Sequence, residues 1–348
     1  METVFRSMEV PFLQQTLRLF VFLCIWATAA GHASARTITD MAGRVVTVPD
    51  QIKRVVPYDN KTNVVLFPVA GDLMVAKARS RENPMLQCIS SEFLNIREVD
   101  TKNHEEVLKL KPDIILVAAF TSGIENLSNY ASFSVKTGIP MVFVDLDLMH
   151  LDKSFEFLGT LLGRETQAVI CADFIRSIYR EAMQYKNNST VKGKVYVANE
   201  TSGLRTVPAG SNHAQVLDVM GIGNVALTGA DTKGFAHVSL EQVMMWNPDY
   251  IVCLGKSNNS PYRQILKSPM WKSINAVKRQ KVFNVPSSPY LWFDMPPSIN
   301  RLLALVWFSE LFYQQPAVQT QQKVTEFYRI FYKYTLTDSD YRKLFAWQ

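Results

Sequence analysis

The chain has 348 residues, 47% of them hydrophobic, so it can bury a full core and is long enough for about two domains. This composition excludes a disordered, collagen-like or small disulfide-rich protein. The net charge of +6 comes from lysines and arginines that are scattered along the chain, which argues against nucleic-acid binding and favours an anionic small molecule as partner.

The first 35 residues have the pattern of a cleavable export signal. The apolar stretch Leu19–Ala30 is preceded by two arginines and followed by Ala33-Ser34-Ala35, the small-x-small pattern that a signal peptidase recognises. A membrane anchor is the weaker interpretation, because a spanning helix needs about 20 apolar residues. We therefore predict a signal peptide over residues 1–35 and an exported mature chain.

Short β-branched runs then alternate with helical periodicity, which is typical of βα units that form parallel sheets. Asn103 followed by Glu106 predicts a helix that begins with a capping box. In the first half we expect strands at 54–57, 74–78, 114–118 and 141–145, and helices at 62–70, 103–110 and 124–136.

The second half repeats this plan at an offset of 136 residues. Residues 239–253 align with 103–117, so that Pro248 and Asp249 correspond to Pro112 and Asp113. A strand is expected at 194–199, in the place of the first-half strand at 54–57. The sequence therefore predicts an α/β protein with two similar lobes that contain mostly parallel sheets.

Residues 151–187 have apolar side chains at helical spacing and no proline, which predicts one long rigid helix between the lobes, with a ligand cleft between them. Two amphipathic helices, 296–313 and 324–333, are expected to pack on the outside of the second lobe. The predicted domains are an N-terminal lobe over 36–150, the connecting helix over 151–187, and a C-terminal lobe with the C-terminal helices over 188–348.

Three cysteines remain after the leader and its Cys24: Cys88, Cys171 and Cys253. Their number is odd and they lie far apart, so they do not form a disulfide framework or a zinc-ligand pattern. We expect buried thiols, with at most one pair bridged.

Four phrases in a fixed order carry a family resemblance. They lie at residues 40–56, 106–115, 239–249 and 271–282, and include the Lys-Pro-Asp and Asn-Pro-Asp turns of the two lobes. The chain resembles the class III substrate-binding proteins of ABC importers, a periplasmic family for ferric siderophores, haem, cobalamin and related metal chelates.

The resemblance implies a periplasmic, monomeric protein that captures an iron chelate, siderophore or haem, and delivers it to an ABC permease in the inner membrane. Cobalamin and an oxyanion such as molybdate are alternative ligands, and an exported receptor or enzyme on the same fold is the alternative without transport. The sequence contains no G-x-S-x-G, P-loop or H-E-x-x-H motif, so we expect no catalytic residue and no cofactor.

The resemblance also implies a surface acid on each lobe that docks on the permease. Asp218, before Gly221, is the expected acid of the second lobe. The first-lobe acid would fall near Val65, where the chain has no acidic residue, so this contact is missing or moved.

Ligand-binding residues are expected in the loops at the carboxyl ends of the parallel strands. Tyr58 is either a phenolate ligand or stacking face, or a half-buried loop aromatic, and Arg205 is either an anion clamp or a solvated arginine. The histidines lack a metal-ligand spacing, so the metal site is left unassigned. The aromatic run 290–293 suits a flat chelate or caps the second-lobe core. The expected ligand-binding residues are Tyr58, Lys61, Phe120, Arg205, His213, His237, Tyr290, Trp292 and Phe293.

Overall fold

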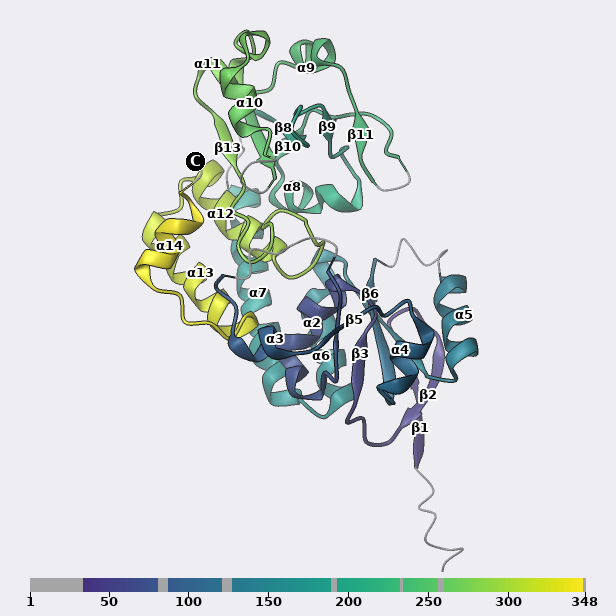
Figure 1. Cartoon of the computed structure of the whole chain (residues 1–348). Coiled ribbons are helices and arrows are strands. Elements are labelled where there is room, and N and C mark those ends of the chain that lie inside the picture. Colours follow the sequence, from purple (N-terminus) through teal and green to yellow (C-terminus); the bar gives the residue numbers. More distant parts are fainter. Residues whose placement is uncertain are drawn as a thin grey trace, which may run out of the picture.

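The computed structural model describes residues 34–80, 87–120, 127–188, 193–231, 234–255 and 260–346. Two α/β lobes lie one above the other, and a single helix, α7 (Glu165–Asn188), runs between them (Figure 1). The predicted signal peptide lies outside the described residues except for Ser34 and Ala35, which already pair with the strand that follows. None of the described helices combines the length and apolar character that a bilayer span requires.

The first lobe is built on three parallel strands in the order β3-β6-β7, and a neighbouring parallel pair, β4 and β5, joins this sheet through a bridge between Val55 and Met74. An antiparallel hairpin of β1 and β2 precedes it. The strands are β1 (Ala35–Thr39), β2 (Val45–Pro49), β3 (Val55–Pro57), β4 (Lys77–Ala78), β5 (Glu98–Val99), β6 (Ile114–Ala119) and β7 (Met141–Asp145), and the helices are α2 (Asn60–Ala70), α3 (Ser91–Asn95), α4 (His104–Lys109) and α5 (Leu127–Thr137).

The second lobe repeats the order of its three parallel strands as β8-β12-β13, with β9, β10 and β11 added on the β8 side. The strands are β8 (Lys194–Asn199), β9 (Arg205–Thr206), β10 (Gly223–Asn224), β11 (Ala236–His237), β12 (Tyr250–Leu254) and β13 (Val282–Asn284). The helices are α8 (Gln215–Met220), α9 (Leu240–Trp246), α10 (Tyr262–Lys267) and α11 (Asn275–Lys278), followed by α12 (Arg301–Tyr313), α13 (Ala317–Phe331) and α14 (Asp338–Leu344).

The aspartates of the Lys-Pro-Asp and Asn-Pro-Asp turns make equivalent hydrogen bonds in the two lobes. Asp113 accepts hydrogen bonds from the backbone N–H groups of Lys53 and Arg54, at 2.7 and 2.9 Å, where the chain enters β3. Asp249 accepts one from the N–H of Lys194, at 3.1 Å, at the start of β8. In both lobes the turn before the middle strand thereby fixes the start of the first strand, and the predicted repeat of two similar lobes is confirmed.

The segment predicted as one helix over 151–187 is two helices. The helix α6 (Leu151–Leu162) ends at Gly163, which adopts a left-handed conformation with a φ of 63°, and α7 begins two residues later. A Cβ on Gly159 would lie 2.5 Å from the Cβ of Ala168, so the small residues let α6 and α7 pack closely as a hairpin. The chain passes from the first lobe to the second through α7, whereas α6 packs against α2 of the first lobe.

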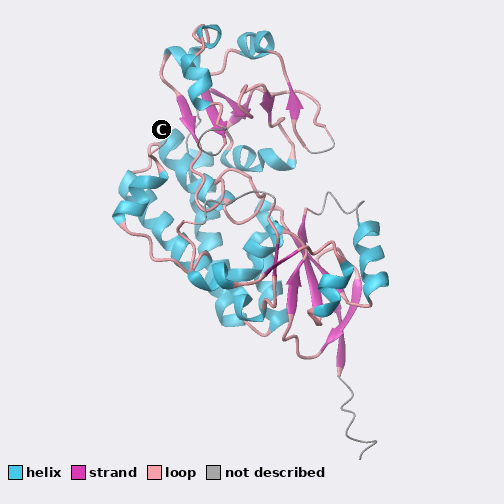
Figure 2. Cartoon of the chain, viewed as in Figure 1, coloured by secondary structure: helices cyan, strands magenta, loops and turns pink. Residues whose placement is uncertain are grey.

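Helices form near the predicted segments 296–313 and 324–333, but they do not lie on the outside of the second lobe as predicted. Every residue of α12 from Arg301 to Ser309 is buried, and α12 packs against α7, α8 and α13. The next helix, α13, packs against α2 and α7, with the ring of Phe331 5.6 Å from that of Phe155 in α6. Helices therefore fill the junction between the two sheets (Figure 2), and the C-terminal segment is shared by both lobes.

The three cysteines of the described chain are free. Cys171 and Cys253 are buried and Cys88 is half-buried. Burial raises the pKa of the Cys171 thiol to about 12, so this group is an inert core thiol at neutral pH. Within the described residues no group of three or more His, Cys, Asp or Glu side chains is arranged to hold a metal ion.

Candidate functional site

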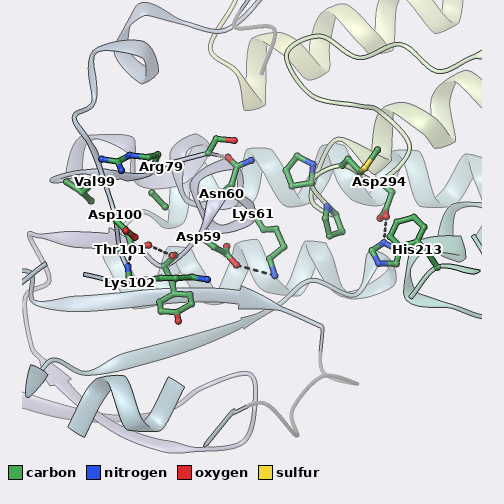
Figure 3. A pocket seen from close by; sticks show the side chains of 17 residues that line it. Asp59, Asn60, Lys61, Arg79, Val99, Asp100, Thr101, Lys102, His213 and Asp294 are labelled. Atoms are coloured by element: carbon green, nitrogen blue, oxygen red, sulfur yellow. Dashed lines mark hydrogen bonds and ion pairs between the residues drawn. The ribbon is translucent and has the colours of Figure 1, made fainter. Parts of the chain in front are cut away.

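A cavity of about 600 Å³ lies at the carboxyl ends of the first-lobe strands and is closed on its far side by the second lobe (Figure 3). This volume is in the range of small-molecule binding sites. The lining residues are Tyr58, Asp59, Asn60, Lys61, Ala78, Arg79, Ser80, Val99, Asp100, Thr101 and Lys102 from the first lobe, and His213, Phe235, Asp294, Met295, Pro296 and Pro297 from the second.

The first turn of α2 and its cap line the first-lobe side of the cavity. Asp59 caps this helix: its Oδ1 accepts from the Thr62 N–H at 3.0 Å and from the Thr62 hydroxyl at 2.8 Å. Its Oδ2 lies 3.2 Å from the Lys61 ammonium, which points into the cavity between the two walls (Figure 3). The Thr62 hydroxyl in turn accepts from the Ala118 N–H of β6, at 2.9 Å. This bond attaches the first turn of α2 to the sheet and thereby fixes the backbone position of Lys61.

Two further cations line the same wall from the loops after β4 and β5. Arg79 and Lys102 are exposed, and neither forms an ion pair with an acid among the residues that the structure describes. Asp100 lies beside them, and its Oδ1 accepts from the Lys102 backbone N–H at 3.1 Å. Arg79 and Lys102 are therefore the cations of this wall that have no acidic partner among the described residues, whereas Lys61 pairs with Asp59.

Tyr58 follows β3 and forms the back of the cavity. Its ring makes edge contacts with Tyr130 and Phe133 of α5, at centroid distances of 5.1 and 5.9 Å, and its carbonyl accepts from the Thr101 hydroxyl at 2.5 Å. Burial raises the pKa of Tyr58, and the neighbouring Tyr130 and Asp59 raise it further. This shift favours the neutral phenol and opposes the predicted phenolate ligand.

The second-lobe wall centres on His213. Its Nδ1 forms a hydrogen bond with Oδ2 of Asp294, and its ring stacks on Phe235 at 4.6 Å with an interplanar angle of 29° (Figure 3). Gly234 leaves room for the ring, since a Cβ at that residue would lie 2.5 Å from Cδ2 of His213. A carboxylate that fixes one ring nitrogen sets the orientation of the other.

Behind this wall lies Arg301, which is fully buried at the junction of the lobes. Its guanidinium donates to the carbonyls of Ser298, at 3.2 Å, and Leu146 and to Oε1 of Gln215, at 2.7 Å. Burial lowers the pKa of the Arg301 guanidinium, and the negative charge of Asp294 is the largest of the interactions that oppose this shift. Leu146 belongs to the first lobe, so Arg301 also ties the two lobes together.

Three other predicted site residues lie near the cavity without lining it. Arg205 stacks on the far side of the cavity wall, with its guanidinium carbon 4.0 Å from the Phe235 ring centroid, and pairs with Glu200 at 3.3 Å. Phe120 lies between His213 and Arg301, at 6.5 and 5.2 Å. His237, opposite Arg205 in the β9–β11 pairing, is exposed and outside the cavity.

The structure places Tyr290, Trp292 and Phe293 in the core and not in the cavity lining. They are at most 2% exposed and lie in the core, where the Trp292 indole N–H donates to the Tyr328 hydroxyl at 3.4 Å. The loop after β13 folds inward and is held there by a hydrogen bond from the backbone N–H of Trp292 to the Pro286 carbonyl, at 3.0 Å. Only its later residues, from Asp294 to Pro297, reach the cavity.

The sequence patterns did not indicate Arg79 or Lys102. The two cations follow strands of only two residues each, β4 and β5, and short strands give a weak periodicity signal. A search for cations one residue beyond every predicted strand would have found Arg79. Asp294 directly follows the aromatic run in the sequence, but its contact with His213 bridges 81 residues and comes only from the fold.

The two predicted docking positions differ in exposure. Asp218 is exposed near the end of α8. Val65 is fully buried in α2, so a side chain at that position faces the core and not a partner. The first exposed acid beyond it is Asp72, which pairs with Arg164 at 2.6 Å.

Known proteins share this architecture over nearly its whole length. Residues 67–289 match the model of the periplasmic binding protein family. The molybdate-binding protein MolA of Haemophilus influenzae is 25% identical over 91% of this chain and 97% of its own. An ABC transporter solute binding protein from Sulfurospirillum deleyianum superposes with a TM-score of 0.79 at 22% identity, covering 89% of this chain and 99% of that one.

A periplasmic solute binding protein from Veillonella parvula gives a TM-score of 0.72 at 24% identity, covering 90% of this chain and 97% of that one. The matched family and these three similar proteins are all binding proteins by name, and the solved structures share the two-lobed fold described above. The chain belongs to the periplasmic binding protein family.

Proposed function

We propose that the chain captures an anionic metal species in the cavity between its lobes and delivers it to an ABC permease. The observation that supports this most directly is that Arg79 and Lys102 line the cavity without an acidic partner among the described residues, while Lys61 lies on the same wall in an ion pair with Asp59. Such a site favours a ligand that carries negative charge. The signal peptide over residues 1–35 belongs to the same proposal, since it would place the chain in the periplasm.

Two kinds of anion fit this proposal. A ferric chelate such as a siderophore is favoured by the cavity volume of about 600 Å³, which is far larger than a single tetrahedral ion needs. An oxyanion such as molybdate is favoured by the similarity to MolA, a molybdate-binding protein. Tyr290, Trp292 and Phe293 lie in the core, so they do not support a flat ligand such as haem or a corrin over these anions.

Removal of the unpaired cations tests the proposal. We expect Arg79→Gln and Lys102→Gln each to weaken binding of the anion by roughly fivefold, about 1 kcal/mol, because both side chains remain partly solvated. The measurement is isothermal titration with sodium molybdate, a ferric tris-catecholate and haemin. Lys109→Gln, an exposed lysine of α4 outside the cavity, is the matched control. If Arg79→Gln and Lys102→Gln, like the control, bind the anions with wild-type affinity, this cavity is not the anion site.

Permease delivery is tested at Asp218. Asp218→Lys reverses an exposed charge outside the cavity, so we expect unchanged ligand affinity and a several-fold loss of permease binding, because the resemblance implies that this acid docks on permease arginines, which a lysine would repel. Co-purification with the cognate permease, with Asp72→Lys measured alongside, distinguishes the two lobes. Retained binding in Asp218→Lys would remove this residue from the docking surface.

A further inference from the structure

One segment of the second lobe concentrates positive charge. Residues 262–281, which contain α10, the single turn Pro269–Trp271 and α11, include six cations and no acid. Six is also the net charge of the whole chain, so the remaining residues carry as many cations as acids. Apolar and polar residues separate most of these six cations, so the segment contains no basic run.

This segment belongs to the outer layer of the second lobe. Along β8, Val197 belongs to the core that continues into the lobe junction, whereas Tyr196 belongs to a separate core on the other face of the sheet. The helices α9, α10 and α11 cover this second core with Val243, Ile265 and Ala276. Figure 1 shows these three helices at the end of the second lobe that lies farthest from the first.

Contacts between α9 and the basic segment make this layer continuous. The rings of Trp246, at the end of α9, and Trp271 lie 6.2 and 6.3 Å from the ring of Tyr196. The side-chain oxygen of Asn247 accepts from the backbone N–H of Asn275, at 2.9 Å, and so joins the end of α9 to the start of α11. The side chains that α9 and the basic segment expose therefore belong to one surface.

Apolar side chains protrude from this surface. Met245 is 85% exposed, Met270 is 66% exposed and Leu266 is 41% exposed. The two methionines directly precede Trp246 and Trp271, so each stands at the outer side of a residue that packs inward. Methionine is flexible and apolar, and can adapt to a fluid apolar environment.

Most of the cations of this layer are available to a partner. Arg279 pairs with Asp249 at 3.6 Å, and Glu241, the other acid of residues 240–281, lies in the first turn of α9, at the opposite end from Met245. Four exposed lysines have no acidic partner among the residues that the structure describes: Lys267, Lys272, Lys278 and Lys281.

These features fit a lipid surface better than a protein partner. The cores of protein interfaces are enriched in arginine and aromatic residues and depleted in lysine, whereas four of the six cations here are lysines and the Trp271 ring is buried. Lysines are attracted to anionic headgroups, and apolar side chains among them enter the boundary between headgroups and acyl chains.

We propose that the outer layer of the second lobe binds the anionic phospholipid surface of a membrane through its lysines, with Met245, Leu266 and Met270 in the headgroup region. The cavity stays accessible in this arrangement, because it lies at the junction of the lobes and not on this layer. The inference goes beyond the proposed function and is independent of which ligand the cavity takes.

The experiment is co-sedimentation of the exported chain with vesicles of phosphatidylethanolamine and phosphatidylglycerol, compared with vesicles of phosphatidylcholine alone. We expect binding to the vesicles that contain phosphatidylglycerol and none to phosphatidylcholine. Because salt screens exposed charges, the partition coefficient should fall by at least about tenfold when the ionic strength is raised from about 0.05 M to about 0.5 M.

Two lysine variants with the same change in net charge locate the contact. A combined Lys267→Gln, Lys272→Gln, Lys278→Gln and Lys281→Gln variant should lower the partition coefficient by at least about tenfold. The matched control replaces four exposed lysines of the first lobe and should stay within about twofold of the wild type. Its substitutions are Lys53→Gln, Lys109→Gln, Lys136→Gln and Lys153→Gln.

The apolar contribution is tested separately. Met245→Gln combined with Met270→Gln should lower the partition coefficient by roughly fivefold, because two apolar side chains no longer leave water on binding. Both residues are exposed in the free protein, so the fold should be unaffected, and circular dichroism checks this.

Three results would overturn the proposal. The first is no binding to phosphatidylglycerol vesicles. The second is an equal loss in the two lysine variants, which would indicate attraction by net charge alone. The third is binding of soluble polyglutamate through the second-lobe lysines without binding to vesicles, which would indicate an acidic protein partner. None of them affects the proposed function, which is tested by ligand titration at the cavity.

Discussion

Arg301→Met is expected to lower the free energy of unfolding by about 3 kcal/mol. The guanidinium is fully buried and donates to Gln215 and to the carbonyls of Ser298 and Leu146, which lose these bonds in the variant. Asp294, also fully buried, loses the positive charge that faces it. The loss of one partner from a buried charged network leaves the others unpaired in a medium of low dielectric constant, and this is the main cost.

Urea denaturation monitored by circular dichroism measures this loss. Arg301→Lys is the matched control, because it keeps the charge but cannot reproduce the three-way donation of the guanidinium, and should fall between the wild type and Arg301→Met. Because Arg301 bonds the Leu146 carbonyl across the lobe junction, Arg301→Met should also widen the spread of lobe orientations in small-angle X-ray scattering. Wild-type stability in Arg301→Met would show that the network makes no net contribution.

Asp40→Ala should destabilise the first lobe by about 3 kcal/mol, since hydrogen bonds to a charged group are worth roughly 1.5–3 kcal/mol each. The buried Asp40 carboxylate accepts from the N–H groups of Ala42 and Arg44, both at 3.0 Å, and from the Arg44 guanidinium at 2.6 Å. It also accepts from the N–H of Phe143 in β7, at 3.1 Å. One side chain therefore closes the β1–β2 hairpin and attaches it to the sheet.

Hydrogen–deuterium exchange gives the local readout for this variant. The amide of Phe143 should exchange much faster in Asp40→Ala, whereas the equivalent strand of the second lobe, β13, should keep its protection. Asp40→Asn retains an acceptor for the turn but not the charge opposite Arg44, so it should lie between the two. Unchanged exchange at Phe143 would contradict the proposed attachment.

The elements with the strongest local signal were predicted well. The strands at 141–145 and 194–199 have the predicted bounds, and the helix after Asn103 begins where its cap requires. One detail of that cap differs: the Glu106 carboxylate accepts from the Asp100 N–H at 2.8 Å, so the helix has an Asn cap but not the reciprocal box. The first α2 turn begins at Asn60, two residues before the predicted start, because Asp59 serves as its cap.

Predictions that depended on exposure were less successful. A run such as Tyr290-Leu-Trp292-Phe293 has the same composition whether it faces a ligand or a core, and only the inward fold of the loop after β13 decides between them. The same holds for 301–309, whose apolar residues were assigned to one face of an outer helix but are enclosed on all sides between α7, α8 and α13. Periodicity describes one element at a time and contains no information on how many neighbours cover it.

The sequence by itself determined the family phrases, the repeat of two α/β lobes, the parallel strands and the loops in which a site should lie, since hydrophobic period, turn residues and caps act over a few neighbouring residues. The tertiary structure alone decided which side chains meet. His213 and Asp294 are 81 residues apart, and Arg301 and Leu146 are 155 apart. Such contacts form because packing brings distant segments together and because buried charges must find partners there, and neither condition is written in any local pattern.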